Sequence, residues 1–198
     1  MENIWLWLKT CDQRLFIYIN SSWTNSFFDS ILPLCREANI WMPVYLFLLV
    51  FALLNFGSKG WLWILFILLT FTLTDQISSK IIKELVGRPR PCRDPYFAQY
   101  VRLLINNCST AGSFTSSHAT NHFGAAVFIS VTLKEYFKDW RYAFFIWAAI
   151  VSYAQVYVGI HYPTDVIGGA VVGSLIGYTT AKFFNRKIGL PGLAAAPF

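Results

Sequence analysis

The sequence predicts an all-α, polytopic membrane helix bundle, with five clear transmembrane helices and interfacial helices at the N-terminus. Its composition is 56% hydrophobic and only 13% charged, whereas soluble domains carry roughly 25% charged residues. Apolar stretches approach the 20 or so residues that a spanning helix needs. The eight Trp and ten Tyr suit the aromatic belts of the bilayer interfaces. A chain of 198 residues suits one membrane-embedded domain.

The first segment, residues 1–38, is apolar but repeatedly interrupted by polar and charged side chains. These are Lys9, Asp12, Arg14, Asn20, Asp29, Arg36 and Glu37. Such interruptions predict one or two amphipathic helices that lie in the membrane interface. A sixth span within residues 14–34 stays open as an alternative.

The membrane-embedded domain is expected over residues 39–187, followed by an irregular tail, 188–198. The predicted spans are 41–56, 61–79, 118–136, 142–157 and 163–184. Pro163 stands in the first turn of the last span, where a missing N–H costs little. The four-residue spacing of Gly169, Gly173 and Gly177 predicts a face for close helix packing.

Between the second and third spans lies the one long hydrophilic stretch, residues 80–117, rich in basic residues and proline. If the spans alternate in direction, this stretch and the turn 160–162 fall at the same membrane face. The opposite face receives the basic residues of the short turns and the C-terminal region: Lys59, Lys134, Lys138, Arg141, Lys182, Arg186 and Lys187. His118 and His161 are therefore expected to meet at one face, close to a helix start in each case.

Three short motifs follow one another at that face: Lys83-x6-Arg90-Pro91, then Ser116-x-His118, then His161-x3-Asp165. Together they resemble the signature motifs of the type 2 phosphatidic acid phosphatase family. That family includes integral-membrane lipid phosphatases and shares its site with vanadium haloperoxidases. Each motif is weak alone, but the three in order at helix starts form a specific pattern over residues 40–185.

The residue types fit a site for phosphate. Lys83 and Arg90 can supply positive charge, and an arginine can bind two phosphate oxygens at once. Ser116 offers a hydroxyl, and the amides of Ser117 and His118 open a helix whose N-terminus attracts anions. The plainer alternative for the two cations is anchoring at the membrane interface.

The resemblance implies that His161 is a nucleophile that forms a phosphohistidine. Asp165, one turn along, would accept the other ring N–H and hold the tautomer, as in a triad. His118 would protonate the leaving oxygen and then activate water. His122 lies on the same helix face as His118 but matches no motif position, so we interpret it as structural or substrate-contacting.

Two positions depart from the family pattern. Ser117 stands where the family has glycine, which matters only if the loop there needs a positive φ. Gln155 stands where the family has an arginine six residues before the histidine. Gln155 can still hydrogen-bond a phosphate oxygen but brings no charge, which lowers the expected efficiency or calls for compensation by Arg88 or Arg93.

These observations predict a metal-independent integral-membrane phosphatase without a cofactor. Its partners would be the bilayer and a lipid phosphate or diphosphate: undecaprenyl diphosphate, phosphatidylglycerol phosphate, phosphatidate or lipid A. A lipid phosphotransferase and a lipid-binding scaffold with a decayed site are the alternatives. Nucleic acid is excluded as a partner because the basic residues form no continuous face, and the sequence fixes no oligomeric state.

The cysteines bear on which side of the membrane holds the site. Cys11, Cys35, Cys92 and Cys108 all fall on the histidine side of the predicted topology. A Cys92–Cys108 disulfide would place that side outside the cytosol, whereas four free thiols would leave the side open. The basic turns of the opposite side agree with a cytoplasmic location for them. The protein is therefore expected in a bacterial inner membrane, with its site facing the periplasm or exterior.

Overall fold

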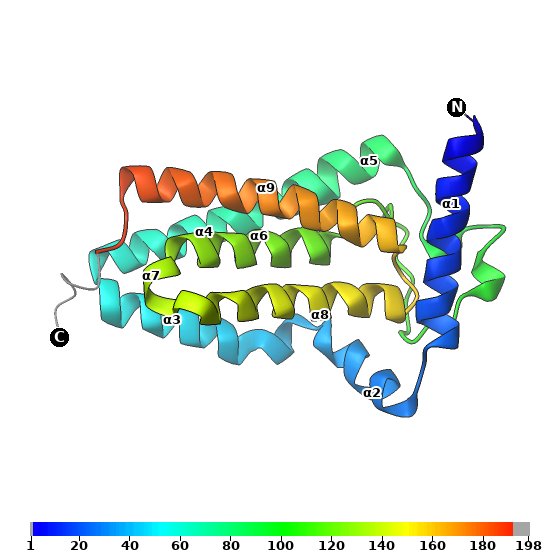
Figure 1. The fold of residues 1–198 in the computed structure, drawn as a ribbon, viewed down its shortest axis with the longest axis horizontal. Coiled ribbons are helices and arrows are strands. Elements are labelled where there is room, and N and C mark those ends of the chain that lie inside the picture. Colours follow the sequence, from blue (N-terminus) through cyan, green and yellow to red (C-terminus); the bar gives the residue numbers. More distant parts are fainter. Residues whose placement is uncertain (1, 192–198) are drawn as a thin grey trace.

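The computed structural model describes residues 2–191, and within them every regular element is a helix. Long helices run side by side in one bundle, and the N-terminal helix lies across one end of it (Figure 1). The long helices are α3 (Met42–Phe56), α4 (Ser58–Gln76), α6 (Ser117–Thr132), α8 (Ala143–Tyr157) and α9 (Pro163–Lys187). The predicted all-α bundle is confirmed. Most of the predicted irregular tail, residues 192–198, lies outside the described residues.

Three helical segments of the described chain are long and apolar enough to cross a membrane. They are Ala38–Phe56, Ser58–Val86 and Pro163–Lys187. Helices α6 and α8 are shorter, with 16 and 15 residues, and run alongside them in the same bundle. Helix α6 is buried along most of its length because α4, α8 and α9 all pack against it.

The second predicted span continues further than expected. Helix α4 runs through the π-helical segment η3 (Ile77–Ile82) into α5 (Lys83–Val86), and it ends at Gly87, whose φ is 60°. The hydroxyls of Ser78 and Ser79 contact the Ser117 hydroxyl at 3.2 and 2.9 Å, so these polar residues have partners without leaving the helix. The 29-residue segment is about 43 Å long, more than the 30 Å or so of a hydrocarbon core. Lys83 therefore stands on a helix end.

The connection from Gly87 to Ser116 contains only two short 3₁₀ helices, η4 (Pro91–Arg93) and η5 (Ala98–Tyr100). A disulfide joins Cys92 to Cys108 across this connection, with Cα atoms 6.3 Å apart, while Cys11 and Cys35 are free thiols. At the other end of the bundle, α7 (Lys134–Phe137) and η6 (Lys138–Tyr142) make the turn between α6 and α8.

The closest helix pair is α6 against α9, and glycine makes it possible. A Cβ on Gly173 would collide with the carbonyl oxygen of Thr120, and one on Gly177 with the carbonyl oxygen of Gly124. The predicted close-packing role of these glycines is confirmed. The consequence for the site is that the first turns of α6 and α9 are held side by side: the Ser116 amide donates to the Asp165 carbonyl at 3.0 Å.

The N-terminal region comprises α1 (Glu2–Ile17), the π-helical η1 (Tyr18–Ser22), α2 (Ser26–Cys35) and η2 (Ala38–Trp41). Helix α2 is anchored on α8, because Leu32 packs with Ala154 and Tyr157. Figure 1 shows α1 across the end of the bundle where α9 begins. The division of the chain at residue 38 stays a prediction.

Candidate active site

The predicted site residues come together at one end of the bundle. Lys83 comes from α5 and Arg90 from the connection after it, while His118 is the second residue of α6. His161 lies in the turn between α8 and α9, and Asp165 lies in the first turn of α9. The contacts described below link these elements, as a shared membrane face requires.

The His161 ring is buried and oriented by an arginine. Its Nε2 lies 3.2 Å from Arg90 Nη1, and the side chain is almost fully buried. Because a guanidinium can only donate hydrogen bonds, Nε2 is the acceptor and Nδ1 carries the proton. The main-chain N–H of His161 donates to the Gln155 carbonyl at 3.3 Å, which closes the turn. The lone pair of Nε2 therefore points to the cationic side of the site.

Burial also controls the charge of this ring. It lowers the pKa of His161 to about 4, and the positive charges of Arg90 and Lys83 act in the same direction. The negative charge of the nearby Asp165 opposes this shift without cancelling it. The imidazole is therefore neutral at physiological pH, which is the form a nucleophile needs.

The contact between His161 and Asp165 is mediated by a serine. His161 Nδ1 lies 3.6 Å from Asp165 Oδ2, longer than a hydrogen bond. Ser113 Oγ lies 3.4 Å from Nδ1 and donates a short hydrogen bond to Asp165 Oδ2. The expected direct bond from the ring to Asp165 is therefore replaced by a contact through Ser113. No sequence signal marks this role, because a serine several residues before a helix start belongs to no motif.

Asp165 itself is fixed from several directions. Its Oδ2 accepts from the Tyr162 main-chain N–H at 2.8 Å, which caps α9, and its Oδ1 accepts from Arg88 Nη1 at 2.8 Å. The carboxylate is completely buried. The same side chain therefore starts the helix and orients the histidine turn.

The two serines of the second motif have different roles: Ser116 caps helix α6, and Ser117 faces the site. Ser116 is the N-cap of α6, and its hydroxyl accepts from the Ala119 amide at 3.5 Å. Ser117 Oγ accepts from Lys83 Nζ at 2.7 Å. The Ser117 and His118 amides are the first of the helix and have no partner within it. This leaves Lys83, Ser117 and two amides for an anion, while the Ser116 hydroxyl serves the helix.

A cavity of about 530 Å³ opens beside these groups. Basic side chains line much of it: Lys83, Arg88, Arg90 and Arg93. The histidines do not line it, but Arg90 both lines the cavity and contacts His161, so it separates the two.

His118 has a different environment. It is half-buried, and its ring stacks at 6.4 Å on that of His122, which lies edge-on to Trp147 at 4.7 Å. His122 Nδ1 pairs with the His118 carbonyl at 2.8 Å. Among the described residues, its buried Nε2 has no hydrogen-bond partner.

Gln155 lies at the base of the His161 turn and is fully buried. Its Nε2 donates to the Val151 carbonyl at 3.3 Å, and in the described structure its Oε1 has no partner. Of the two cations expected to compensate for it, Arg88 is engaged by two carboxylates, whereas Arg93 lines the cavity.

A third cation, Arg36 at the end of α2, was missed by the sequence analysis. It acts electrostatically on both His118 and Arg90, and its partly buried side chain pairs with Glu37 at 3.1 Å. In the sequence, Arg36 is only an interruption of an apolar segment, and nothing local connects it to the site.

Comparison with known proteins identifies the family of the chain. The chain is 32% identical over 174 residues to a lipid A 4′-phosphatase of Bacteroides thetaiotaomicron, covering 86% of this chain and 76% of that protein. It is 30% identical to the phosphatidylglycerophosphatase B of Bacillus subtilis, covering 87% and 80%. The crystal structure of a transmembrane PAP2-type phosphatidylglycerolphosphate phosphatase from Bacillus subtilis superposes with a TM-score of 0.67 at 20% identity, covering 91% and 87%. The sequence profile of the PAP2 superfamily matches residues 60–188. The chain therefore belongs to the PAP2 superfamily.

Proposed function

We propose that this protein is an integral-membrane phosphatase that hydrolyses a phosphate or diphosphate group on a lipid, through a phosphohistidine at His161. One observation carries the proposal. His161 presents its Nε2 lone pair to Arg90 at 3.2 Å, while its Nδ1 side is held by Ser113 and Asp165. A buried, neutral and oriented imidazole beside paired cations is the arrangement that nucleophilic attack on phosphorus needs.

In the proposed reaction, the two histidines have different roles. His161 Nε2 attacks phosphorus, and the N–P bond forms as the bond between phosphorus and the lipid oxygen breaks. His118 gives its proton to that oxygen and then takes one from water. The resulting hydroxide attacks phosphorus, the N–P bond breaks, and phosphate leaves. Lys83, Arg90 and the first amides of α6 stabilise the charge that develops on the phosphoryl oxygens.

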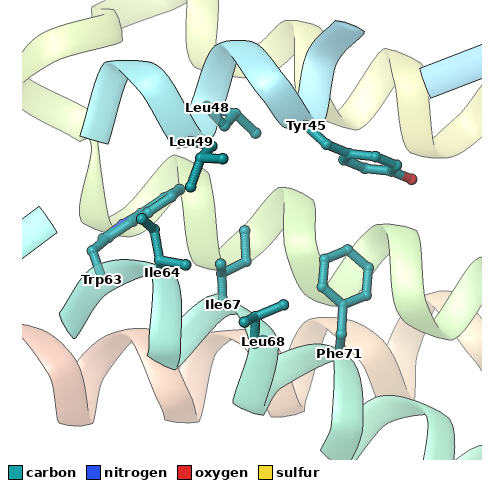
Figure 2. Close-up of a pocket in the computed structure, with 8 residues that line it drawn as sticks. All are labelled: Tyr45, Leu48, Leu49, Trp63, Ile64, Ile67, Leu68 and Phe71. Carbon is teal, nitrogen blue, oxygen red and sulfur yellow. The ribbon is translucent and has the colours of Figure 1, made fainter. Parts of the chain in front are cut away.

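An apolar groove between α3 and α4 supports a lipid substrate. It has a volume of about 440 Å³ and is lined by Tyr45, Leu48, Leu49, Trp63, Ile64, Ile67, Leu68 and Phe71. Figure 2 shows these side chains directed toward one another from the two helices. Tyr45 lies edge-on to Trp147 at 6.1 Å, and Trp147 contacts His122. An acyl or prenyl chain in the groove would thus lie near Tyr45 and Trp147, which are linked to His118 through the ring of His122.

The names of the relatives suggest which lipid substrates to test first. The relative at 32% identity acts, by its name, on the 4′-phosphate of lipid A, and the one at 30% identity on phosphatidylglycerophosphate. We therefore place a lipid A phosphate first. Phosphatidylglycerol phosphate, undecaprenyl diphosphate and phosphatidate complete the set of candidate substrates.

We place the protein in a bacterial inner membrane with its site facing the periplasm. The Cys92–Cys108 disulfide lies in the connection that carries Arg90, and disulfides persist outside the cytosol. The basic turns lie at the other end of the bundle, as the positive-inside rule requires of a cytoplasmic end. Trp5 and Trp7 are exposed on α1, which fits a helix lying in the interface.

The decisive experiment is phosphate release from the four lipids by the purified full-length protein, with His161→Asn prepared in the same way. We expect release from at least one lipid, insensitive to EDTA, and none from the variant. Activity retained by folded His161→Asn would refute the assignment. Transfer of the phosphoryl group to an added lipid alcohol would establish the phosphotransferase alternative, and binding without turnover would establish the scaffold.

Orientation is tested separately. Intact cells treated with a reductant and an impermeant maleimide should become labelled at Cys92 and Cys108, and a Cys92→Ser, Cys108→Ser double variant should lose that labelling. Labelling of these cysteines only after lysis would place the site in the cytoplasm.

A further inference from the structure

Helix α1 reaches the first turn of α9 through one acidic side chain. Asp12 Oδ1 accepts from the Thr164 amide at 2.9 Å, and its Oδ2 accepts from the Thr164 hydroxyl at 2.6 Å. The carboxylate is almost fully buried. Thr164 directly precedes Asp165, so these bonds tie the N-terminal helix to the segment that carries the orienting carboxylate.

An arginine extends this link to Asp165. Arg88 Nη2 donates to Asp12 Oδ2 at 2.6 Å, and its Nη1 donates to Asp165 Oδ1 at 2.8 Å. The same Nη1 lies 2.7 Å from the Thr164 hydroxyl, and the guanidinium stacks on the Tyr162 ring at 4.0 Å. Arg88 is thus held between two carboxylates over an aromatic face.

The charges explain why two carboxylates share this arginine. Asp165 is completely buried beside a neutral histidine, so Arg88 supplies its charged partner. Arg88 also lines the cationic cavity, where a substrate phosphate would compete for it. Asp12, on the side of Arg88 that faces α1, holds the guanidinium in place against that competition.

We infer that Asp12, acting through Arg88, positions Asp165, so that helix α1 forms part of the catalytic apparatus. This inference rests on the proposed function, because Asp165 matters for turnover only if His161 is the nucleophile. The rival role for Arg88 is direct binding of the substrate phosphate. The two roles differ in kinetics: a positioning residue acts on kcat, whereas a phosphate ligand acts on KM.

The chain offers a matched control in the same region. Asp29 of α2 pairs with Arg102 at 2.8 and 2.9 Å and accepts from the Tyr157 hydroxyl at 2.7 Å. This pair also ties the N-terminal region to the connection between Gly87 and Ser116. In the described structure, neither Asp29 nor Arg102 contacts a residue of the candidate site. Asp29→Asn therefore reports on general loosening of the N-terminal region.

The test compares kcat and KM for Asp12→Asn, Asp12→Glu, Arg88→Gln and Asp29→Asn in the full-length protein, with the lipid that the wild type hydrolyses. Displacement of a catalytic group can cost about 100-fold, and we expect a loss of that size in kcat for Arg88→Gln. For Asp12→Asn we expect a loss of about tenfold, with KM changed less than about twofold. Asp12→Glu should recover most of the activity, because it keeps the charge, and Asp29→Asn should match the wild type.

Several results would overturn the inference. An Asp12→Asn protein with wild-type kcat would do so. Equal losses of kcat in Asp12→Asn and Asp29→Asn would also do so, because they would indicate general loosening. A raised KM at unchanged kcat in Asp12→Asn would favour the rival role of phosphate binding. If Asp12→Asn does not fold, Thr164→Val is used instead. It removes the contacts of the Thr164 hydroxyl with Asp12 and Arg88 and should lower kcat about threefold at unchanged KM. An active His161→Asn would remove the proposed function and this inference together, whereas an inactive His161→Asn with a fully active Asp12→Asn removes the inference alone.

Discussion

The two histidines of the site occupy contrasting environments. His161 is almost fully buried, with Arg90 on one ring nitrogen and Ser113 near the other. His118 is half-buried at a helix start, and its ring stacks on His122. The His161 ring has a partner at each nitrogen, whereas the His118 ring packs against the His122 ring.

The difference matches the two roles proposed for them. A nucleophile must keep one tautomer and one direction, so its surroundings fix it at both nitrogens. A group that serves first as acid and then as base must reach the leaving oxygen and afterwards a water molecule. Such a group needs access more than rigidity.

His161→Asn should remove the nucleophile while keeping a polar side chain of smaller volume. We expect lipid phosphate release to fall by at least about 10⁴-fold, since covalent and general-base routes both begin at this ring. Phosphate release and thermal unfolding measured on the same preparation check the prediction. Activity within about tenfold of the wild type would contradict the role of His161 as nucleophile.

His118→Ala should separate the two chemical steps. Loss of a general acid and base costs about 10²- to 10⁴-fold in turnover with a lipid leaving group. With an activated aryl phosphate, which needs no acid, we expect a stoichiometric burst and a trapped phosphohistidine. His122→Ala is the matched control on the same helix face and should show no accumulation. A His118→Ala protein without any trapped intermediate would count against the covalent route.

Ser113→Ala should loosen the nucleophile without removing it. The hydroxyl bridges His161 and Asp165. His161 Nδ1 and Asp165 Oδ2 are 3.6 Å apart, too far for a direct hydrogen bond. Loss of one hydrogen bond to a charged group is worth roughly 1.5–3 kcal/mol, so we expect kcat to fall between about 10- and 100-fold. Ser113→Thr keeps the hydroxyl and should retain more activity. Equal kinetics for Ser113→Ala and the wild type would mean that Asp165 orients the ring alone.

Gln155→Arg should raise the rate modestly, by about threefold, if the missing family charge is a deficit at this site. Arg36 and Arg93 already contribute positive charge nearby, which keeps the expected gain small. Steady-state kinetics of Gln155→Arg and of the uncharged control Gln155→Leu measure the effect. A slower but folded Gln155→Arg protein would show that another cation already fills this place.

The pH dependence of phosphoenzyme formation should be nearly flat in the weakly acidic range. Burial lowers the pKa of His161 to about 4, so the ring stays neutral and nucleophilic as the pH falls from 7 to 5. For an unperturbed histidine with a pKa of about 6.5, the neutral fraction would fall about 25-fold over the same range. Rapid-quench measurements with an activated aryl phosphate, corrected for ionisation of the substrate, should show a change of less than about twofold.

Local patterns in the sequence predicted the helices and the residues of the candidate site. Long apolar stretches marked the bundle, and the motifs at the helix starts selected Lys83, Arg90, His118, His161 and Asp165, because these signals are local. The alternation of spans also placed both histidines at one end. The structure extended one helix from Ser79 to Val86, where hydroxyl contacts with Ser117 allow polar residues to stay helical.

Contacts between segments far apart in the sequence hold these residues in place. Asp12 bonds to Thr164, which is 152 positions away, and Ser113 bonds to Asp165, which is 52 positions away. Neither partner is marked by spacing or composition. Both contacts exist because glycines let α6 and α9 approach closely, and because α1 lies across the start of α9. Packing between distant segments, which no local pattern records, therefore brings these groups to Asp165 and to its neighbour Thr164.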